Sequence, residues 1–432
     1  MDATKRLTIK TFRHFMHDSL YRNSILLMAN TAVLGIFSFV FWLLAARTYS
    51  SGDVGLISSV VATSTLLASL SFLGFDYAFI KYIPSSKKSD ERANTGLSFA
   101  AILSVIVSVV YLLLIPELIP KVGFLTSSMW WIVGFIILIL ATTWNTLTNS
   151  IFIAHRITQY ALFATILLGL LRIPLLYSFK SDGAGGLLIA QIVGMLVCVV
   201  ASFFFLYRHA NYKFKFYISR QELNHMASYA FSTYLANVSG GLPALILPTI
   251  ILWMLGAPSA AYFFIANQFA YLLYIIPSAT SQSLFAEGAW QEERLEDLLK
   301  RAAKLMYIFI VPSVMLMVIL GWVLLSLFGK TYASSGYWML VFFSITALPK
   351  IASYLFSTVL RINSHVKPVV IVATIGTVIQ LGASYIGMRI TPNLITLGIA
   401  ALLCEIFVSI SYTVLFFHYR RLESLQLLNA NS

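Results

Sequence analysis

Twelve long apolar segments, joined by short polar connections, make up most of this 432-residue chain. A helix needs about 20 mostly apolar residues to cross about 30 Å of hydrocarbon, and the segments approach that length. Only 10% of the residues are charged and 59% are hydrophobic, whereas a soluble chain is about 25% charged. The connections leave no room for a soluble domain, so the chain is expected to fold and act within a bilayer.

The twelve segments are expected to be helices. A lone crossing segment must satisfy its own backbone hydrogen bonds, and these segments lack the alternation of a membrane barrel. Arg172 and Pro174 interrupt the fifth. The predicted fold class is all-α, a polytopic membrane protein with 12 transmembrane helices. They lie near residues 24–46, 54–75, 93–115, 129–154, 160–176, 187–207, 228–255, 260–285, 302–328, 337–360, 369–388 and 394–418.

Basic residues are distributed unequally between the two sets of connections. With the N-terminus in the cytoplasm, most of the 29 lysines and arginines lie on the inner face. The positive-inside rule therefore predicts a protein of the cell (inner or plasma) membrane with both termini in the cytoplasm. This placement explains the net charge of +13 without a nucleic-acid partner. The first span is expected to serve as its own signal, with no cleavable signal peptide.

The longest central connection, about residues 208–226, has six spans before it and six after it. It contains Asn-Tyr-Lys-Phe-Lys-Phe-Tyr, a basic aromatic stretch suited to lipid headgroups. A shift that places Asn30 over Asn237 aligns parts of the two halves, which favours a parallel duplication. Two unrelated six-helix halves are the alternative. The predicted domains are an N-terminal six-helix lobe, residues 1–211, and a C-terminal six-helix lobe, residues 212–432.

Catalytic and metal-binding motifs are absent from the sequence. It contains no glycine-rich phosphate loop, no His-Glu-x-x-His and no Cys-x-x-Cys, so we expect neither an enzyme nor a metal site. Cys198 and Cys404 both lie in predicted spans and are interpreted as small apolar residues. Ser-Gly-Gly-Leu-Pro at 239–243 is the densest break in a span. It is either a hinge or an ordinary feature of membrane helices.

Ionisable residues within or at the ends of the spans mark candidate functional positions. Such groups cost about 3 kcal/mol or more in hydrocarbon and usually face a protein interior or a wet cavity. Arg172, Lys350 and Glu405 lie deep in spans, whereas Asp76 and Lys81 lie near the end of the second. A structural pairing is the alternative for Arg172 and Glu405, and snorkelling to the interface is the alternative for Asp76 and Lys81.

Small polar residues concentrate in spans one, two, seven and eight. They include Asn30, Asn237, Asn267 and Gln268, together with many serines and threonines. Such side chains either join helices by hydrogen bonds, worth about 0.6 kcal/mol each, or line a wet cavity. Their occurrence at corresponding places in both halves suits a cavity between the halves.

Two segments resemble a known family. Ala-Ala-Arg-Thr-Tyr-Ser-Ser-Gly-Asp-Val-Gly-Leu at 45–56 and Leu-Gly-Phe-Asp-Tyr-Ala at 73–78 resemble the first two helices of the polysaccharide-biosynthesis flippases. That family includes the O-antigen flippases. Its superfamily also holds the multidrug and toxin extrusion transporters and the lipid II flippase. The resemblance implies a V-shaped transporter of two six-helix bundles, with a cavity lined largely by helices one, two, seven and eight.

The implied activity is translocation by alternating access. The resemblance implies a flippase that carries a polyprenyl-pyrophosphate-linked oligosaccharide from the cytoplasmic to the outer leaflet. Basic cavity residues would meet the pyrophosphate, and Arg47, Lys81 and Arg172 are the candidates by charge and depth. Membrane lipids are expected partners, and polysaccharide polymerase or ligase machinery is a candidate partner. No cofactor is expected beyond coupling to an H⁺ or Na⁺ gradient, for which Asp76 and Glu405 are the candidates.

Three other classes remain as alternatives. An ion-coupled multidrug exporter of the same superfamily would want an acidic residue deep in the cavity. A membrane glycosyltransferase or polymerase is opposed by the short outer connections, and a purely structural membrane protein is the last alternative. The sequence does not identify the sugar.

Overall fold

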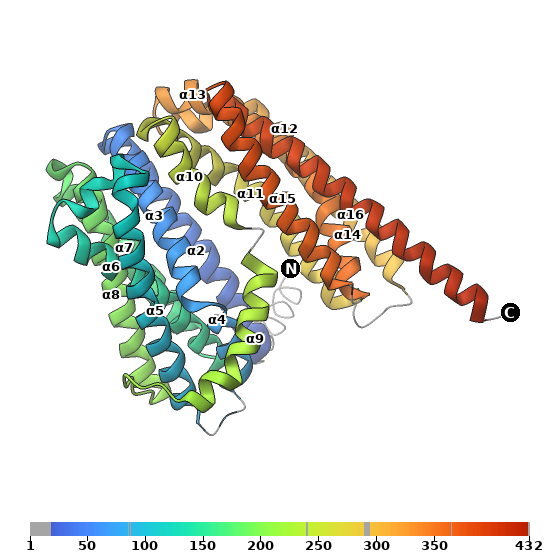
Figure 1. The fold of residues 1–432 in the computed structure, drawn as a ribbon, viewed down its shortest axis with the longest axis horizontal. Coiled ribbons are helices and arrows are strands. Elements are labelled where there is room, and N and C mark those ends of the chain that lie inside the picture. Colours follow the sequence, from blue (N-terminus) through green and yellow to red (C-terminus); the bar gives the residue numbers. More distant parts are fainter. Residues whose placement is uncertain are drawn as a thin grey trace, which may run out of the picture. The chain divides into compact units, whose positions relative to one another are not determined.

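The computed structural model describes residues 19–84, 86, 88–238, 241–288, 294–363 and 365–430. Every secondary-structure element in these ranges is helical, as the sequence predicted. The chain divides into two compact units, Met1–Leu235 and Ala236–Ser432 (Figure 1). The predicted lobe boundary between residues 211 and 212 stays a prediction.

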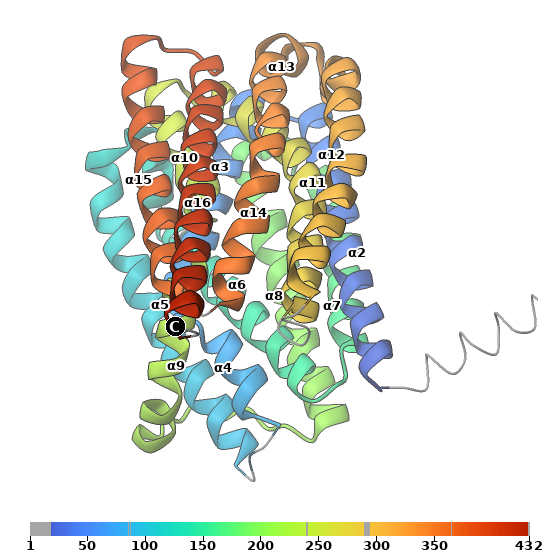
Figure 2. The same ribbon diagram turned by 90° about the vertical axis from the view of Figure 1, so that its right-hand side faces the viewer.

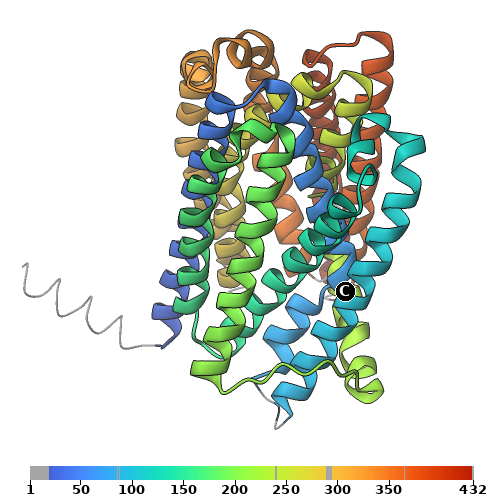
Figure 3. The same cartoon turned by 90° about the vertical axis from the view of Figure 1, so that its left-hand side faces the viewer.

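The first unit is a bundle of long helices with two shorter ones. Helix α6 packs against α3, α5 and α8, and α7 packs against both α2 and α8 (Figure 3). The short α4 packs against α5 and α6. The helices are α2 (Ser19–Thr48), α3 (Ser51–Phe72), α4 (Phe75–Tyr82), α5 (Ser89–Leu118), α6 (Met129–Ala154), α7 (Gln159–Ser178), α8 (Ala184–Ala210) and α9 (Arg220–Val238). Two 3-10 turns, η1 (Pro120–Thr126) and η2 (Lys180–Asp182), accompany them.

The second unit is built around α11, which packs against α10, α12, α13 and α14. Helix α16 packs against α13, α14 and α15, and Figure 2 shows α14, α15 and α16 side by side. The helices are α10 (Leu242–Met254), α11 (Ala257–Gly288), α12 (Leu295–Ser326), α13 (Lys330–Ile345), α14 (Ala347–Ile362), α15 (Val366–Ile390) and α16 (Ile395–Ala430).

Eleven spans in the described ranges are long and apolar enough to cross a membrane. One of them, Lys330–Ile362, combines α13 and α14 and corresponds to the predicted tenth span. The difference from the expected count of 12 lies in the seventh, residues 228–255, which α9 and α10 divide between them. Pro243 lies in the first turn of α10 after Gly241, and neither residue favours a continuous helix.

The distribution of side chains is that of a membrane protein. Large apolar side chains such as Leu113, Ile319 and Val378 are strongly exposed on the long helices, where lipid rather than water would cover them. Many serine and threonine side chains are buried instead, including Ser58 and Ser59, which donate to the Gly55 carbonyl of their own helix. Buried small polar residues permit close helix packing in a bilayer.

The Gly-Asp-Val-Gly motif joins the starts of two helices. Ser50 precedes α3 and accepts from the Asp53 backbone N–H over 3.1 Å, the usual arrangement of an N-cap. The Asp53 carboxylate accepts from the Ser50 hydroxyl over 2.6 Å. It also accepts from the backbone N–H of Ala184, the first residue of α8, over 3.0 Å. One carboxylate therefore fixes α3 against α8.

The Leu-Gly-Phe motif makes the turn from α3 into α4. Leu73 and Gly74 both have positive φ values, 42° and 84°, and a non-glycine residue is strained at such angles. A Cβ on Gly74 would lie 2.1 Å from the Ala230 carbonyl oxygen. Only glycine therefore allows α9 to pack this closely against the turn, where Met226 and Ala230 join a core with Phe75 and Phe79.

Candidate functional site

Arg172 is a cation without a carboxylate partner among the described residues. It lies in α7, and its guanidinium carbon is 5.9 Å from the centre of the Phe41 ring on α2. Its Nε is buried without a hydrogen-bond partner in the described part of the chain. The close approach of its stem to Gly194 places it against α8 as well. A guanidinium in this setting can bind an anion with several parallel hydrogen bonds.

Lys81 lies in α4 within an aromatic cluster. Its Nζ is 3.8 Å from the centre of the Tyr229 ring and 5.1 Å from that of Tyr82. The Tyr82 ring also packs against His225, at 4.9 Å between ring centres. Lys81 itself is exposed, so the ammonium can contact an anion while its aromatic neighbours hold it in place.

Asp76 lies in the first turn of the same short helix. It is the second residue of α4, and its Oδ1 is buried without a hydrogen-bond partner among the described residues. A buried carboxylate oxygen without a donor is costly. A proton or a cation could satisfy this carboxylate oxygen.

Lys350 and Glu405 form a second charged cluster, in the second unit. The Lys350 ammonium lies 2.6 Å from Glu405 Oε2, and the Ser353 hydroxyl donates to Glu405 Oε1 over 2.6 Å. Lys350 Nζ also lies 5.0 Å from the centre of the Tyr274 ring. The Glu405 carboxylate is thus satisfied by a cation and a hydroxyl of α14.

The remaining predicted residues lie on α2, α9 and α11. Arg47 is exposed in the last turn of α2, and Asn30 lies in the same helix with its Oδ1 buried and without a partner there. Asn267 is half-buried and Gln268 exposed on α11. Asn237 belongs to α9, but its side chain lies outside the described residues.

Sequence reasoning missed the partners that the fold supplies. It singled out Lys350 and Glu405 but did not pair them, since 55 residues separate them. It did not single out the aromatic residues Tyr229 and Tyr274. Each tyrosine lies on a different helix from its lysine and far from it in the sequence, so no local pattern points to the contact. Among the described residues, no group of His, Cys, Asp and Glu side chains could hold a metal ion.

Comparison with known proteins gives one family match. The profile of the family described as "Polysaccharide biosynthesis protein" matches residues 20–285, which is more than half of the chain. No curated protein matches the sequence significantly.

Solved structures with a similar fold cover almost the whole chain. An inward-facing multidrug resistance MATE family transporter of the MOP superfamily matches with a TM-score of 0.70 and 17% identity, over 92% of this chain and 98% of that one. The lipid II flippase MurJ, in an inward closed conformation, matches with a TM-score of 0.72 and 15% identity, over 90% and 86%. A MATE structure in complex with MaL6 has a TM-score of 0.63 and 19% identity, over 94% and 96%.

These similar structures are of transporters and flippases rather than enzymes. At identities below 20% they establish the fold, a polytopic all-α membrane protein.

Proposed function

The chain belongs to the polysaccharide biosynthesis protein family, and from this premise we propose that it is a lipid flippase. Its proposed substrate is a polyprenyl-pyrophosphate-linked oligosaccharide, moved from the cytoplasmic to the outer leaflet. The fold shared with a lipid II flippase and with MATE transporters supports this class of activity. The proposed location is the cell membrane, with both termini in the cytoplasm, because this orientation follows the positive-inside rule.

The observation that carries the proposal is the state of Arg172. An unpaired cation within a membrane-spanning helix costs several kcal/mol, yet Arg172 has no carboxylate partner among the described residues and its Nε is unsatisfied there. A pyrophosphate would supply the missing negative charge and accept hydrogen bonds in bidentate geometry. Lys81 and Arg47, both exposed, are proposed as further contacts for the headgroup.

The oligosaccharide poses a different physical problem. Its hydroxyl groups lose hydrogen bonds to water on entering hydrocarbon, which costs several kcal/mol for each unpaired group. Asn30, Asn237, Asn267 and Gln268 are proposed to replace some of these bonds. The polyprenyl tail stays in the bilayer. Alternating access would come from one lobe rocking against the other. The proposed hinge is Ser-Gly-Gly-Leu-Pro at 239–243, of which residues 239 and 240 lie outside the described residues.

Energy coupling is proposed to act through an acidic residue. Glu405 is already paired with Lys350 and Ser353, whereas the Asp76 Oδ1 has no partner in the described part of the chain. Asp76 is therefore the stronger candidate for H⁺ or Na⁺ coupling. The same observation favours the second candidate function, an ion-coupled multidrug exporter, because a buried acid could also bind a cationic drug.

One experiment distinguishes the two candidate functions. The full chain is reconstituted in sealed vesicles, and uptake of a cationic dye is compared with transbilayer movement of a fluorescent polyprenyl-pyrophosphate oligosaccharide. The flippase proposal expects lipid movement above that of protein-free vesicles. Dye transport driven by a gradient, without lipid movement, would support the exporter instead. An Asp76→Asn variant is expected to lose the gradient dependence of whichever activity is found.

A further inference from the structure

The connection between α8 and α9 forms an ordered strap on the first unit. Residues 211–219, here called the strap, are non-helical and cross the end of the unit from α8 to α9 (Figure 3). Polar side chains of α5 accept hydrogen bonds from alternate backbone N–H groups of the strap. The bonds are Lys215 to Asn94 over 3.0 Å, Tyr217 to Ser98 over 3.1 Å and Ser219 to Thr95 over 3.1 Å.

Side chains hold the beginning of the strap as well. The buried Tyr212 hydroxyl donates to Asn94 Oδ1 over 2.6 Å, and Asn94 Nδ2 donates to the Lys213 carbonyl over 3.3 Å. The Phe214 ring packs against Trp144 and Phe203, at 5.5 and 5.4 Å between centres. Both the backbone and the inward side chains of the strap are therefore fixed.

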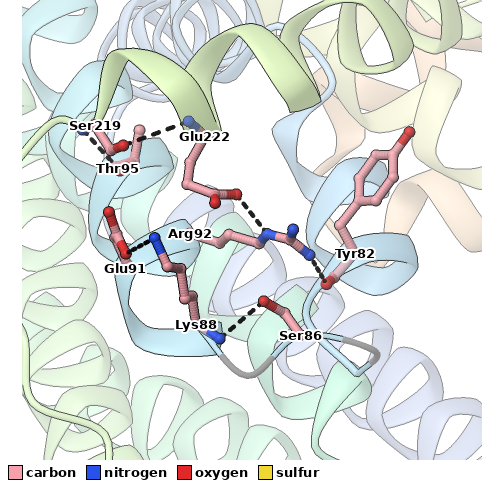
Figure 4. A network of polar contacts seen from close by, with 8 residues as sticks. All are labelled: Tyr82, Ser86, Lys88, Glu91, Arg92, Thr95, Ser219 and Glu222. Carbon is pink, nitrogen blue, oxygen red and sulfur yellow. Dashed lines mark hydrogen bonds and ion pairs between the residues drawn. The ribbon is translucent and has the colours of Figure 1, made fainter.

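An ion pair neutralises the acidic residue that follows the strap. Arg92 Nε lies 2.6 Å from Glu222 Oε2, and its terminal nitrogen donates to the Tyr82 carbonyl over 2.7 Å (Figure 4). Both side chains of the pair are largely buried, 15% and 8% exposed. The Glu222 charge is thus satisfied within the protein and does not offset cations on the surface.

The outward face of the strap is basic and aromatic. Between Tyr207 and Arg220 the sequence contains no acidic residue. Phe216 is 65% exposed and Tyr217 is 51% exposed. Burial and, to a lesser extent, the Asp90 carboxylate raise the pKa of the Tyr212 phenol, and the exposed cations outnumber this one carboxylate. These cations are Arg208, Lys213, Lys215 and Arg220.

The position of this surface identifies its partner. The strap follows directly on α8, a membrane-spanning helix that ends at Ala210, so it lies at the level of the headgroups. Aromatic side chains favour this level. Basic residues there attract anionic lipids, with a gain of about fivefold in affinity, or about 1 kcal/mol, for each residue near the surface.

We propose that the strap is a binding site for anionic lipid headgroups, with Lys213 and Lys215 contacting the phosphate and Phe216 and Tyr217 seated among the headgroups. Its occupant is a bulk anionic phospholipid, distinct from any transported substrate. The hydrogen bonds to α5 hold the cations and the rings in place before the lipid arrives, which lowers the entropy cost of binding.

The test uses the purified full chain in detergent, titrated with phosphatidylglycerol or phosphatidylcholine, with bound lipids counted by native mass spectrometry. The parent chain is expected to bind phosphatidylglycerol in preference. The double variant Lys213→Gln/Lys215→Gln should lower that affinity by about fivefold to about thirtyfold and leave phosphatidylcholine binding unchanged. If the double variant fails to fold, Lys215→Gln alone should show a loss of about fivefold.

The matched control is Arg301→Gln/Lys304→Gln, which removes two exposed cations from α12. It should lower phosphatidylglycerol affinity less than the strap variant does, since these two side chains lack the exposed Phe216 and Tyr217 rings of the strap beside them. Unchanged binding by the strap variant would overturn the proposal. An equal loss in the α12 control, or an equal loss of phosphatidylcholine binding, would do the same. Competition by soluble glycerol phosphate at the same concentration as the lipid would indicate a site for free anions and contradict a lipid site.

Discussion

The Lys350 ammonium and the Glu405 carboxylate lie 2.6 Å apart and join α14 to α16 within the second unit. Their side chains are 25% and 12% exposed, so neither charge is well solvated. Removing one partner of a buried pair leaves the other uncompensated, which costs about 3–5 kcal/mol. We expect Lys350→Met to lower the thermal stability of the purified protein strongly, as measured by its melting temperature in detergent.

The double variant Lys350→Met/Glu405→Leu distinguishes the contribution of the ion pair to stability from that of the surrounding packing. Because it buries no unpaired charge, it should be more stable than either single variant. Lys300→Met breaks an exposed pair with Glu296 and serves as the control, with no measurable loss expected. If Lys350→Met melts like this control, the pair does not stabilise the second unit.

A second prediction concerns the carboxylate of Asp53. Asp53→Ala removes the acceptor for the Ala184 N–H at the start of α8, and loss of a helix cap costs about 0.5–2 kcal/mol. A lower melting temperature is expected, while Asp53→Asn should retain most of the stability because its amide oxygen can still accept. Asp182→Ala removes an exposed acid nearby and should have little effect. Equal melting of Asp53→Ala and Asp182→Ala would contradict the capping role.

A third prediction follows from the turn at Gly74. Gly74→Ala would place a Cβ 2.1 Å from the Ala230 carbonyl oxygen, in addition to the strain of a positive φ, which costs about 1–3 kcal/mol. Helix α9 would have to move away from α4, so reduced expression and a lower melting temperature are expected. Gly35→Ala is the matched control, since no atom lies within 4 Å of its added Cβ. It should be neutral or stabilising by about 0.5–1 kcal/mol.

A fourth prediction separates the stability of Arg172 variants from their activity. Arg172→Gln removes a cation that has no carboxylate partner among the described residues, so membrane insertion and melting temperature should not fall. Transport should fall by about tenfold to about a hundredfold, because hydrogen bonds to a charged group contribute about 1.5–3 kcal/mol.

The controls for Arg172 are chosen by charge and position. Arg172→Lys should recover only part of the activity, since it keeps the charge and loses the bidentate geometry. Arg389 is an exposed cation that donates to the Tyr385 hydroxyl, and Arg389→Gln should transport normally. Full activity in Arg172→Gln would remove this residue from the proposed headgroup site.

Much of the architecture could be predicted from the sequence, because the bilayer imposes length and composition on each span. The all-helical fold followed from this, and so did the burial of Cys198 and Cys404, which lie in predicted spans. The division of the seventh span could be located at Ser-Gly-Gly-Leu-Pro. The residues at which α9 ends and α10 begins could not be predicted. Glycine and proline weaken a helix, but the packing around them decides where it ends.

The contacts between distant residues could not be predicted. The pairs Arg92–Glu222 and Lys350–Glu405 join residues that are far apart in sequence. Which helices pack side by side determines whether such residues meet. The role of Asp53 was hidden for the same reason. Its motif was visible as a family resemblance, but its bond to Ala184 depends on the position of α8. The buried serines of α3 also show that small polar residues in a span can serve packing as well as a cavity.

The measurement that tests the central proposal most directly is transbilayer movement of lipid-linked oligosaccharides in sealed vesicles containing the full chain. Two substrates with the same glycan and polyprenyl tail are compared, one with a pyrophosphate linkage and one with an uncharged linkage. We predict rapid movement of the pyrophosphate form by the parent chain, and a loss of that preference in Arg172→Gln. Equal rates for both substrates in parent and variant, or no movement above that of protein-free vesicles, would contradict the account.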